Sequence, residues 1–427
     1  MTRSSNGRRV VISGLGFITC IGNDRASVTA SLRQQRHGIE RFDFIPGAEL
    51  PVRVAGTIKE FDTRSDHFSE WRWPDRYTFT RESLRSLPPH GLHARCAVDQ
   101  LIAEARLTPE LLADESTGLF TASAGSPFLQ RLHLNAIHET RGERVPPMSV
   151  VSSASGTLNF NLAAHYGIRG AVCGFTSACA STAHAIGYAT DEIARGRLQR
   201  VIVVGGDELT AESTYSFHGM RALSRNPDPN TASRPFDAAR DGFVGTGGAC
   251  ALLLENADAA RERGAPIFAE VIGWGQSADG YHMAITDPAG HGLARAMRRA
   301  LDDAGVTPGE IDYVNAHATS TPSGDRSELK ALHTIFTAVG ARPAVSSTKA
   351  LTGHGLSMAA VMETAFCAVA MAEGFTPGQS HLVTPDADCG ELNLPRENLP
   401  RPPEIVLKNS SGFGGSNVSL VLRRASA

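Results

Sequence analysis

Short runs of β-branched and apolar residues alternate along the chain with longer stretches in which apolar positions recur every three to four residues. The short runs predict strands, and the longer stretches predict helices that bury one face against a sheet. The predicted strands lie at residues 9–12, 118–122, 171–175, 201–204, 311–314, 344–346, 404–406 and 418–422, and the predicted helices at 179–195, 327–336 and 355–373. This alternation predicts an α/β fold in which helices pack on sheets.

The predicted strands fall into two sets, one before about residue 254 and one after about residue 266. The segment between them, 255–264, has the pattern of an amphipathic connector and not of a flexible linker. A chain of 427 residues is long enough for two to three domain-sized units. Two similar halves are compatible with this pattern, although periodicity alone does not establish them.

Composition and charge narrow the functional classes. Apolar residues make up 41% of the chain and charged residues 20%, which is typical of a soluble globular protein. The net charge of −3 gives no global basic field, so we expect neither nucleic-acid nor membrane binding. The longest apolar region, 358–375, is interrupted by Glu363, Thr364 and Glu373 and therefore predicts a buried helix instead of a membrane span.

Targeting and cysteine signals point to a reducing compartment. Residues 1–9 are polar and run directly into the first apolar stretch, without the longer apolar block of a signal peptide. The seven cysteines contain no C-x-x-C pair, so the sequence supports neither a zinc site nor a disulfide framework. We therefore expect a cytoplasmic protein with no metal and no bound cofactor.

The strongest local signal for chemistry is Cys179, in the segment 176–184 of sequence TSACASTAH. A strand ends there, small residues form a tight turn, and the cysteine lies where a helix is predicted to begin. The free N–H groups and positive end of a helix would lower the pKa of the thiol and favour the thiolate. A buried structural cysteine is the alternative, and it is the commoner role for a cysteine taken alone.

Two histidines occupy matching positions. His317 comes just after the predicted strand 311–314, and His354 follows the predicted strand 344–346 and precedes a helix. Catalytic groups gather at the carboxyl ends of strands in such sheets. Either histidine alone is weak evidence among the 15 in the chain, but one cysteine and two histidines in equivalent positions form a stronger candidate site.

Glycine-rich segments occur near both ends of the chain. The segment 409–417, NSSGFGGSN, could aim N–H groups at an oxyanion or could be a plain turn between strands. The pair Gly14 and Gly16 resembles the start of a dinucleotide-binding motif, but position 19 is Thr and no ribose-binding acid follows at the expected distance. We therefore discount a dinucleotide.

Taken together, these segments resemble the β-ketoacyl-acyl carrier protein synthases, the condensing enzymes of the thiolase fold. The resemblance runs from about residue 9 to residue 423. The segments that carry it are SAC at 177–179, RPFDAARDGFV at 234–244, NAHATSTP at 315–322, TKALTGH at 348–354 and GFGG at 412–415. One cysteine with two histidines is similar to the elongating synthases, and the run GTGG at 245–248 to the type I enzymes.

The resemblance implies a fold, a reaction and a set of site residues. The fold is a five-layered αβαβα arrangement of two similar halves, here 1–255 with the nucleophile and 256–427 with both histidines. Cys179 would take an acyl group from a carrier-protein thioester. Malonyl-carrier protein would then lose carbon dioxide, with His317 and His354 donating hydrogen bonds to the enolate from neutral imidazoles whose tautomers backbone contacts hold. The N–H groups of Cys179 and Phe413 would bind the oxyanion.

Further positions match supporting roles in the family. Lys349 and Glu363 match a catalytic pair, although an ion pair that only holds the helix is an equal alternative. Thr319 and Thr321 match residues that bind the pantetheine arm, Phe413 a gating aromatic, and Gly412 and Gly414 the substrate-binding turn. Family members form homodimers, and their partner is an acidic acyl carrier protein. A basic patch for docking it could include the four arginines Arg72, Arg76, Arg81 and Arg85, which could equally form a solvated face.

Departures from the family pattern leave the substrate open. Ser411 stands where a second Phe is usual in the family, which predicts a wider or wetter acyl entrance. Ser357-Met358 replaces the usual Gly-Ala, and Arg221 replaces a frequent Gly. A specialised ketosynthase for a polyene, polyketide or unusual lipid, which could form a heterodimer with a ketosynthase-like chain-length-factor partner, is the alternative to fatty-acid elongation. A chain-length-factor-like partner without catalysis and a non-decarboxylating thiolase are the rivals. Retention of Cys179, His317 and His354 argues against the first, and the threonine-rich segment 319–321 against the second.

Overall fold

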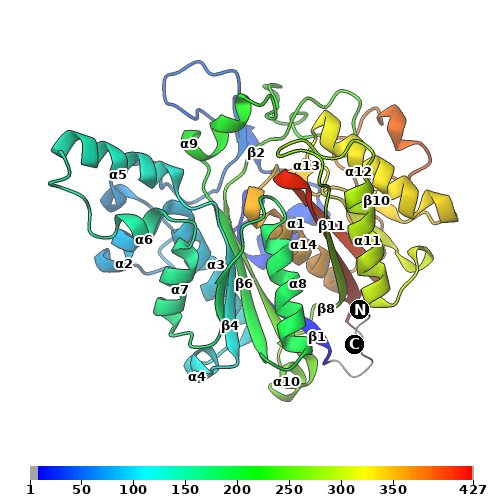
Figure 1. Cartoon of the computed structure of the whole chain (residues 1–427), viewed down its shortest axis with the longest axis horizontal. Helices are drawn as coiled ribbons and strands as arrows, with labels where there is room; N and C mark the ends of the chain where they lie inside the picture. The colour runs from blue at the N-terminus through cyan, green and yellow to red at the C-terminus, as the bar shows by residue number, and fades with distance from the viewer. Residues whose placement is uncertain (1–7, 426–427) are drawn as a thin grey trace.

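Ten strands of the protein form one hydrogen-bonded network in a computed structural model that describes residues 8–425 (Figure 1). The strands nearer the N-terminus are β1 Val10–Ile18, β4 Thr117–Ala122, β5 Val172–Gly174, β6 Arg200–Asp207 and β7 Gly248–Asn256. The others are β8 Ala269–Ala278, β9 Tyr313–Asn315, β10 Ala344–Ser346, β11 Ile405–Gly412 and β12 Ser416–Arg424. A separate small pair consists of β2 Ile39–Arg41 and β3 Val54–Gly56.

The two sets of strands have the same internal order. The first runs β5-β4-β6-β7-β1 and the second β10-β9-β11-β12-β8. In both, the first three strands are parallel and the last two are added antiparallel. The sets meet where β1 and β8 pair antiparallel over two positions. This repetition confirms the prediction of two similar halves, whereas the boundary between 1–255 and 256–427 stays a prediction.

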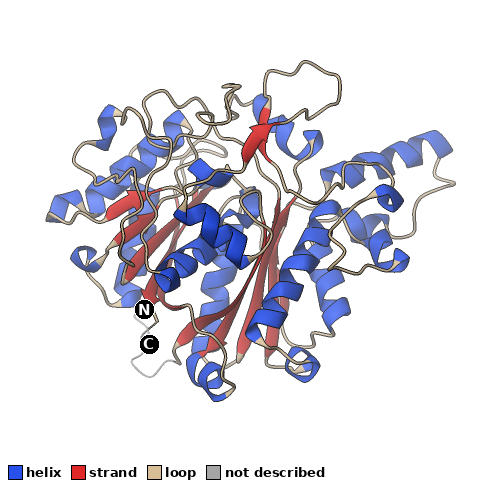
Figure 2. Cartoon of the chain, turned by 180° about the vertical axis from the view of Figure 1, so that it is seen from behind, coloured by secondary structure: helices blue, strands red, loops and turns tan. Residues whose placement is uncertain are grey.

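Helices cover the outer faces of both sets and fill the space between them (Figure 2). On the outer face of the first set lie α3 Pro89–Ala105 and α7 Thr157–Tyr166, and on that of the second α11 His291–Ala304 and α12 Pro322–Ile335. Between the sets lie α8 Ser181–Ala194 and α14 Ala359–Glu373, whose side chains share one core with both (Figure 1). The layers therefore follow the predicted αβαβα order.

The remaining helices lie around this framework. They are α1 Arg25–Arg33, α2 Arg81–Ser86, α4 Pro109–Ala113, α5 Pro127–Thr140, α6 Ser149–Ser153, α9 Ala211–Thr214, α10 Ala257–Glu262 and α13 Lys349–Thr352. Within the described residues, the stretch Leu356–Glu373 is the one helical stretch long and apolar enough to cross a membrane. Its helix α14 is buried without interruption from Ala359 to Met371, as expected of the core helix that its polar interruptions predict.

Several boundaries differ from the predicted ones for identifiable reasons. β1 continues through both of its glycines to Ile18, because α3 packs directly on the strand: a Cβ at Gly16 would lie 1.8 Å from the carbonyl oxygen of Ala97. The expected helix at 327–336 begins earlier, with Pro322 in its first turn. The connector 255–264 contains the short helix α10.

Candidate active site

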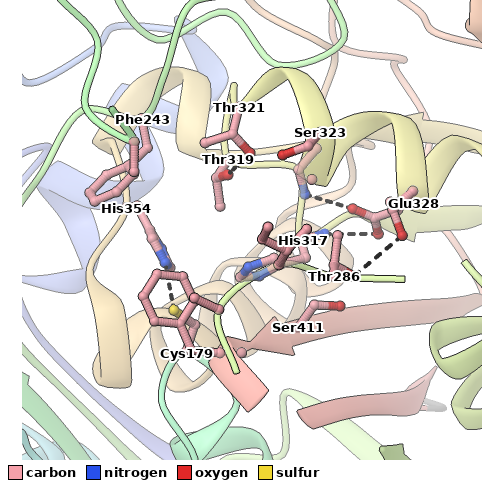
Figure 3. A pocket seen from close by; sticks show the side chains of 18 of the residues that line it. Cys179, Phe243, Thr286, His317, Thr319, Thr321, Ser323, Glu328, His354 and Ser411 are labelled. Carbon is pink, nitrogen blue, oxygen red and sulfur yellow. Dashed lines mark hydrogen bonds between the residues drawn. The ribbon is translucent and has the colours of Figure 1, made fainter. Parts of the chain in front are cut away.

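Cys179, His317 and His354 converge although they come from distant parts of the chain (Figure 3). Cys179 lies in the turn between β5 and α8, His317 two residues after β9, and His354 two residues after α13. The Nε2 atom of His354 is 3.0 Å from the sulfur of Cys179. The two imidazole rings meet edge to face with centroids 5.3 Å apart. The structure thus brings together the three residues that the sequence predicts as reactive.

A strained turn presents the cysteine. Ala178 has a φ of +50°, in the left-handed region that residues with a Cβ rarely adopt. The hydroxyl of Ser181 holds the turn by accepting from the N–H of Ser177 and donating to the carbonyl of Ala178. On the other side the end of β11 presses on the same turn, since a Cβ at Gly412 would lie 2.6 Å from the Ser177 carbonyl oxygen.

The protonation states match the prediction for the histidines but not for the cysteine. Burial, and next the positive charge of Lys349, hold the pKa of His317 and of His354 well below 6.5, so both rings are neutral. Burial raises the pKa of Cys179 to about 12, and Lys349 opposes this only in part. The expected low pKa is therefore wrong: the helix α8 begins two residues after Cys179, and the cost of burying a thiolate outweighs its favourable field.

The expected backbone contacts to the imidazoles are also missing. Among residues 8–425, no hydrogen-bond partner is found for Nδ1 of His317 or of His354. The main chain of each is anchored instead: the N–H of His354 donates to the carbonyl of Val244, and that of His317 to Glu328. The main chain that carries each ring is therefore held in place, while among the described residues no partner selects a tautomer.

A buried group of charged side chains lies behind the reactive residues. Lys349 contacts one carboxylate oxygen of Glu363, and Lys408 lies 2.7 Å from the other, with all three side chains fully buried. The structure places Lys349 and Glu363 together as the sequence predicts. Lys408 was not predicted, because a single lysine at the end of an apolar strand run carries no local signal of burial.

Glu328 is a second functional residue that sequence reasoning missed. Its carboxylate accepts from the N–H groups of His317 and Ala318 and from the side chain of Asn409. It is buried, and burial raises its pKa while these three donors lower it. Glu328 thereby fixes the backbone that carries His317. The sequence signal that could have identified Glu328 is a carboxylate on the apolar side of the predicted helix 327–336.

A cavity of about 250 Å³ opens from the reactive residues to the surface. Thr319 and Thr321 line it, with their hydroxyl oxygens 3.0 Å apart, and so do Gly412, Ser411 and Phe413. The residues at its mouth include Met220 and Arg221, and the φ of Arg221 is +55°. The cavity joins the reactive sulfur to solvent through a passage whose wall includes the hydroxyls of Thr319 and Thr321.

The remaining predicted positions fall beside this cavity. Gly414 lies in the same turn, where its N–H donates to the carbonyl of Met283. The hydroxyl of Ser411 donates to Asn417 at 2.7 Å, so a polar contact stands at the expected gate position. Ser357 is buried and contacts Asp207. Ser411 and Ser357 both depart from the family pattern, and both contact neighbouring side chains around the site.

The ligand atoms of Cys179, His317 and His354 all lie within 4.8 Å of one another, a spacing that could hold a soft metal ion. The charge of Lys349 acts on all three groups, however, and would repel a dication. The same charge favours an anion. The arrangement therefore suits a thiol nucleophile flanked by two neutral hydrogen-bonding groups.

The five layers and the Cys-His-His site together define a condensing enzyme of the thiolase-like class. The family descriptions "Beta-ketoacyl synthase, N-terminal domain" and "Beta-ketoacyl synthase, C-terminal domain" match residues 7–260 and 268–383. The chain belongs to the beta-ketoacyl synthase family and is an acyltransferase that forms carbon–carbon bonds.

Characterised relatives match nearly the full length. The chain is 36% identical over 423 residues to 3-oxoacyl-[acyl-carrier-protein] synthase 1 of Escherichia coli (strain K12), covering 98% of this chain and 99% of the relative. It is 34% identical over 432 residues to 3-oxoacyl-[acyl-carrier-protein] synthase 2 of Staphylococcus aureus (strain COL), covering 99% and 100%.

Solved structures agree with this assignment. A beta-ketoacyl synthase from Burkholderia phymatum STM815 superposes with a TM-score of 0.88 at 32% identity, covering 98% of this chain and 100% of that one. The ishigamide ketosynthase/chain length factor superposes with a TM-score of 0.86 at 28% identity, with the same coverage.

Proposed function

We propose that this protein is a 3-oxoacyl-[acyl-carrier-protein] synthase that elongates fatty acids by decarboxylative Claisen condensation. The observation that carries the proposal is the 3.0 Å contact between the thiol of Cys179 and the neutral imidazole of His354, with His317 beside it. A protonated thiol next to a neutral base is the arrangement that thioester exchange requires. Curated relatives with this activity match the chain from end to end.

In the first half-reaction, Cys179 attacks the thioester of an acyl-carrier protein. Because its pKa is raised to about 12, the thiol enters protonated, and Nε2 of His354 accepts the proton as the S–C bond forms. The pantetheine thiolate leaves and takes up that proton. The acyl group is now held on the sulfur, with its carbonyl oxygen near the N–H groups of Cys179 and Phe413.

In the second half-reaction, the malonyl thioester loses carbon dioxide and its carbonyl oxygen becomes negative. His317 and His354 donate hydrogen bonds to this oxygen, and the charge of Lys349 supports it. The carbanion attacks the acyl-cysteine and the C–S bond breaks. The 3-oxoacyl product leaves on the carrier, and the Cys179 thiolate takes up a proton from solvent to restore the thiol. Nδ1 of His354 has no partner among residues 8–425, so Nε2 can accept a proton in the first half-reaction and, in the tautomer that carries its proton there, donate a hydrogen bond in the second.

Intact-protein mass spectrometry tests the proposal. The protein is exposed to a panel of acyl-carrier proteins and then to malonyl-carrier protein, with Cys179→Ala as control. We expect one acyl adduct that the variant lacks, followed by a condensed 3-oxoacyl product. Absence of any adduct across a broad panel would overturn a self-sufficient ketosynthase. Turnover of acetoacetyl-coenzyme A without a malonyl donor would indicate a thiolase.

A specialised ketosynthase for a polyene, a polyketide or an unusual lipid is the second candidate. The serine at position 411, bonded to Asn417, supports it, because a polar group lines the acyl entrance where the family resemblance predicts a ring. The structural relative named as a ketosynthase/chain length factor supports pairing with a second subunit. A preference for long or polyunsaturated chains in the same panel would favour this candidate.

The carrier protein is the expected partner, and exposed cations mark its approach. Arg221 is exposed at the mouth of the cavity, whereas Arg72, Arg76, Arg81 and Arg85 are exposed outside its lining. Reversing the charge of a docking arginine should raise the KM for carrier-bound substrate and leave turnover of a free thioester unchanged. Equal loss with both substrates would count against docking at that residue.

A homodimer is the assembly that the surface favours. All three residues of β5 are exposed at the edge of the sheet, and an unpaired edge is a ready surface for another strand. α7 lies beside β5 and α6 packs on α7, and both expose large apolar side chains, including Phe160 at 48% and Val150 at 75% exposure. A second copy that covers this face would bury both features. We place the protein in the cytoplasm, consistent with its buried apolar helix and free cysteines.

A further inference from the structure

Lys408 is a fully buried lysine that neither the nucleophile nor the histidines contact directly. It lies on β11, where its register partner on β9 is Asn315, two residues before His317. Three oxygens surround its Nζ: Glu363 Oε2 at 2.7 Å, the carbonyl of Asn409 at 2.7 Å and the hydroxyl of Ser410 at 2.6 Å. An ammonium group has three N–H donors, so this shell fits the charged form of the side chain.

The carboxylate of Glu363 is shared between two ammonium groups. Lys349 contacts one oxygen and Lys408 the other. The second buried carboxylate nearby, Glu328, accepts from three N–H groups, as an ionised carboxylate does. With both lysines charged, two positive charges balance two negative ones. Without Lys408 the same enclosed region would hold one positive and two negative charges.

This balance of buried charges matters because the reaction develops negative charge next to these side chains. The proposed cycle forms an enolate oxygen and a tetrahedral oxyanion next to Cys179, His317 and His354. An excess negative charge in a buried region would oppose both and would favour protonation of the imidazoles. Lys349 alone cannot prevent this, because Glu363 would then neutralise its charge.

We infer that Lys408 is a positioning residue for catalysis: by sharing Glu363 it leaves the charge of Lys349 available to the reacting groups and keeps both histidines neutral. The inference rests on the proposed condensing function. It assigns to Lys408 an electrostatic task and no contact with substrate. Burial is the largest influence on Lys408 and lowers its pKa, while the ion pair with Glu363 opposes this in part.

Titratable or charged side chains come from several of the elements packed around this group. The set consists of Lys349 on α13, Glu363 and Cys367 on α14, Tyr313 on β9, Glu328 on α12, the two histidines His317 and His354, and Cys179 before α8. Burial raises the pKa of both Cys367 and Tyr313 far above neutrality, so neither takes a charge between pH 6 and 8. The groups in this set that a lost lysine charge can bring into titration are therefore the two histidines and Glu328, whose pKa burial already raises, so the test follows the histidines directly.

The test compares three substitutions at one position. Lys408→Met removes the charge, Lys408→Gln removes the charge but keeps a hydrogen-bond donor, and Lys408→Arg keeps the charge. Each protein is labelled with ¹³C-histidine, and the signals of His317 and His354 are assigned by difference with His317→Asn and His354→Asn. We expect at least one of the two pKa values to rise by roughly one unit or more in the Met and Gln variants and to stay in place in the Arg variant.

Activity gives the second readout. The rate of malonyl decarboxylation in the Met and Gln variants, relative to wild type, should fall by about twofold at the raised histidine pKa and further below it, while the KM for the acyl donor stays constant. Loss by one factor at every pH, or identical histidine titrations in wild type and Lys408→Met, would overturn the inference. Thermal unfolding confirms that each variant is folded.

The two readouts separate this inference from the function on which it rests. The histidine titrations need no substrate, so they report on Lys408 even if the wild type condenses nothing. A wild type that lacks malonyl decarboxylation would overturn the proposed function. A wild type that condenses, together with unshifted histidines in both uncharged variants, would overturn the role of Lys408 alone.

Discussion

The two imidazoles beside Cys179 are enclosed on all sides except toward the cavity, and each has lost the water that would stabilise its charged form. Burial is the largest cause of their lowered pKa values, and the positive charge of Lys349 adds to it. A neutral imidazole can donate to an enolate oxygen, whereas an imidazolium near Lys349 would cost electrostatic energy. Their environment thus sets the protonation state that the condensation uses.

The pH dependence of malonyl decarboxylation follows from these shifts. The neutral rings are the active form, and their pKa values lie well below 6.5, so they remain neutral as the pH falls from 8 to 6. We expect the initial rate of carbon dioxide release to stay level over this interval, to within about twofold. The rate is measured with malonyl-carrier protein in buffers of constant ionic strength. An acid limb centred near pH 6.5 would show that at least one ring titrates normally.

The residues of the site differ in how far the sequence reveals them. Glu363 could be predicted, because a carboxylate inside an apolar helix needs a buried partner. Lys408 and Glu328 could not be assigned, since their contacts depend on the register between β11 and β9 and on the packing of α12. The raised pKa of Cys179 was also out of reach, because it depends on how much protein surrounds the sulfur.

At the scale of the element, the turn between β11 and β12 contains two glycines that are required for different structural reasons. Gly412 has a φ of −116°, which any residue can adopt, but it lies against the turn that carries Cys179: a Cβ there would be 2.6 Å from Ser177 O and 3.1 Å from Cys179 N. Gly414 has a φ of +77° and open space around it. The first glycine is required by close approach and the second by backbone conformation.

Substituting each glycine by alanine should therefore give different results. Gly412→Ala pushes the main chain at Cys179 away and should slow acylation of the cysteine by roughly tenfold or more, as small displacements of reacting groups do. Gly414→Ala should cost about 1 kcal/mol of stability, because alanine is strained at positive φ, with a much smaller effect on acylation. Rapid-mixing mass spectrometry and thermal unfolding measure the two effects. Equal acylation rates in the two variants would contradict this assignment.

The helices and strands also show which sequence patterns predict an element and its bounds, and which do not. Runs with one clear period, such as those of β6 and α14, are found close to their predicted places. β7 and β8 were not among the predicted strands: β7 is buried at every position and so has no alternation of apolar and polar residues. β1 was predicted too short, because its glycines resemble a turn until the close packing of α3 is known.

At the scale of the whole molecule, the exposed edge at β5 is the most consequential surface. Ala171 O and Phe175 N bond to β4, so the alternation of a parallel ladder directs the N–H and C=O groups of Val172 and Gly174 outward. α7 packs beside this strand, α6 packs on α7, and both helices expose large apolar side chains. An unpaired ladder next to exposed apolar surface favours association with a second copy.

A single charge on this face should separate the subunits. Val150 on α6 is 75% exposed, and burying a glutamate there against a partner would leave an unpaired charge. We expect the wild type to scatter light as a dimer and Val150→Glu as a monomer. Val339, an exposed valine at 64% on the opposite half, provides the matched control, and Val339→Glu should remain a dimer. A dimeric Val150→Glu would place the interface elsewhere.

The stability of the whole fold in acid should depend on His93, far from the reactive sulfur. His93 is 6% exposed, packs edge to face on Phe61, and neither ring nitrogen has a partner among residues 8–425. Burial lowers its pKa from 6.5 to about 3. Below pH 6.5 the unfolded chain therefore binds a proton that the folded protein refuses, and the free energy of unfolding falls until about pH 3.

Replacing His93 removes this proton linkage. Between pH 7 and pH 5 the wild type should lose about 2 kcal/mol more stability than His93→Phe or His93→Gln. Asp325, whose pKa burial raises to about 7, acts in the opposite direction, but it is common to all three proteins and cancels in the comparison. Denaturant unfolding at the two pH values, at one protein concentration, gives the difference. Parallel losses in wild type and both variants would mean that His93 titrates in the folded protein, and that water or a bound group reaches its ring.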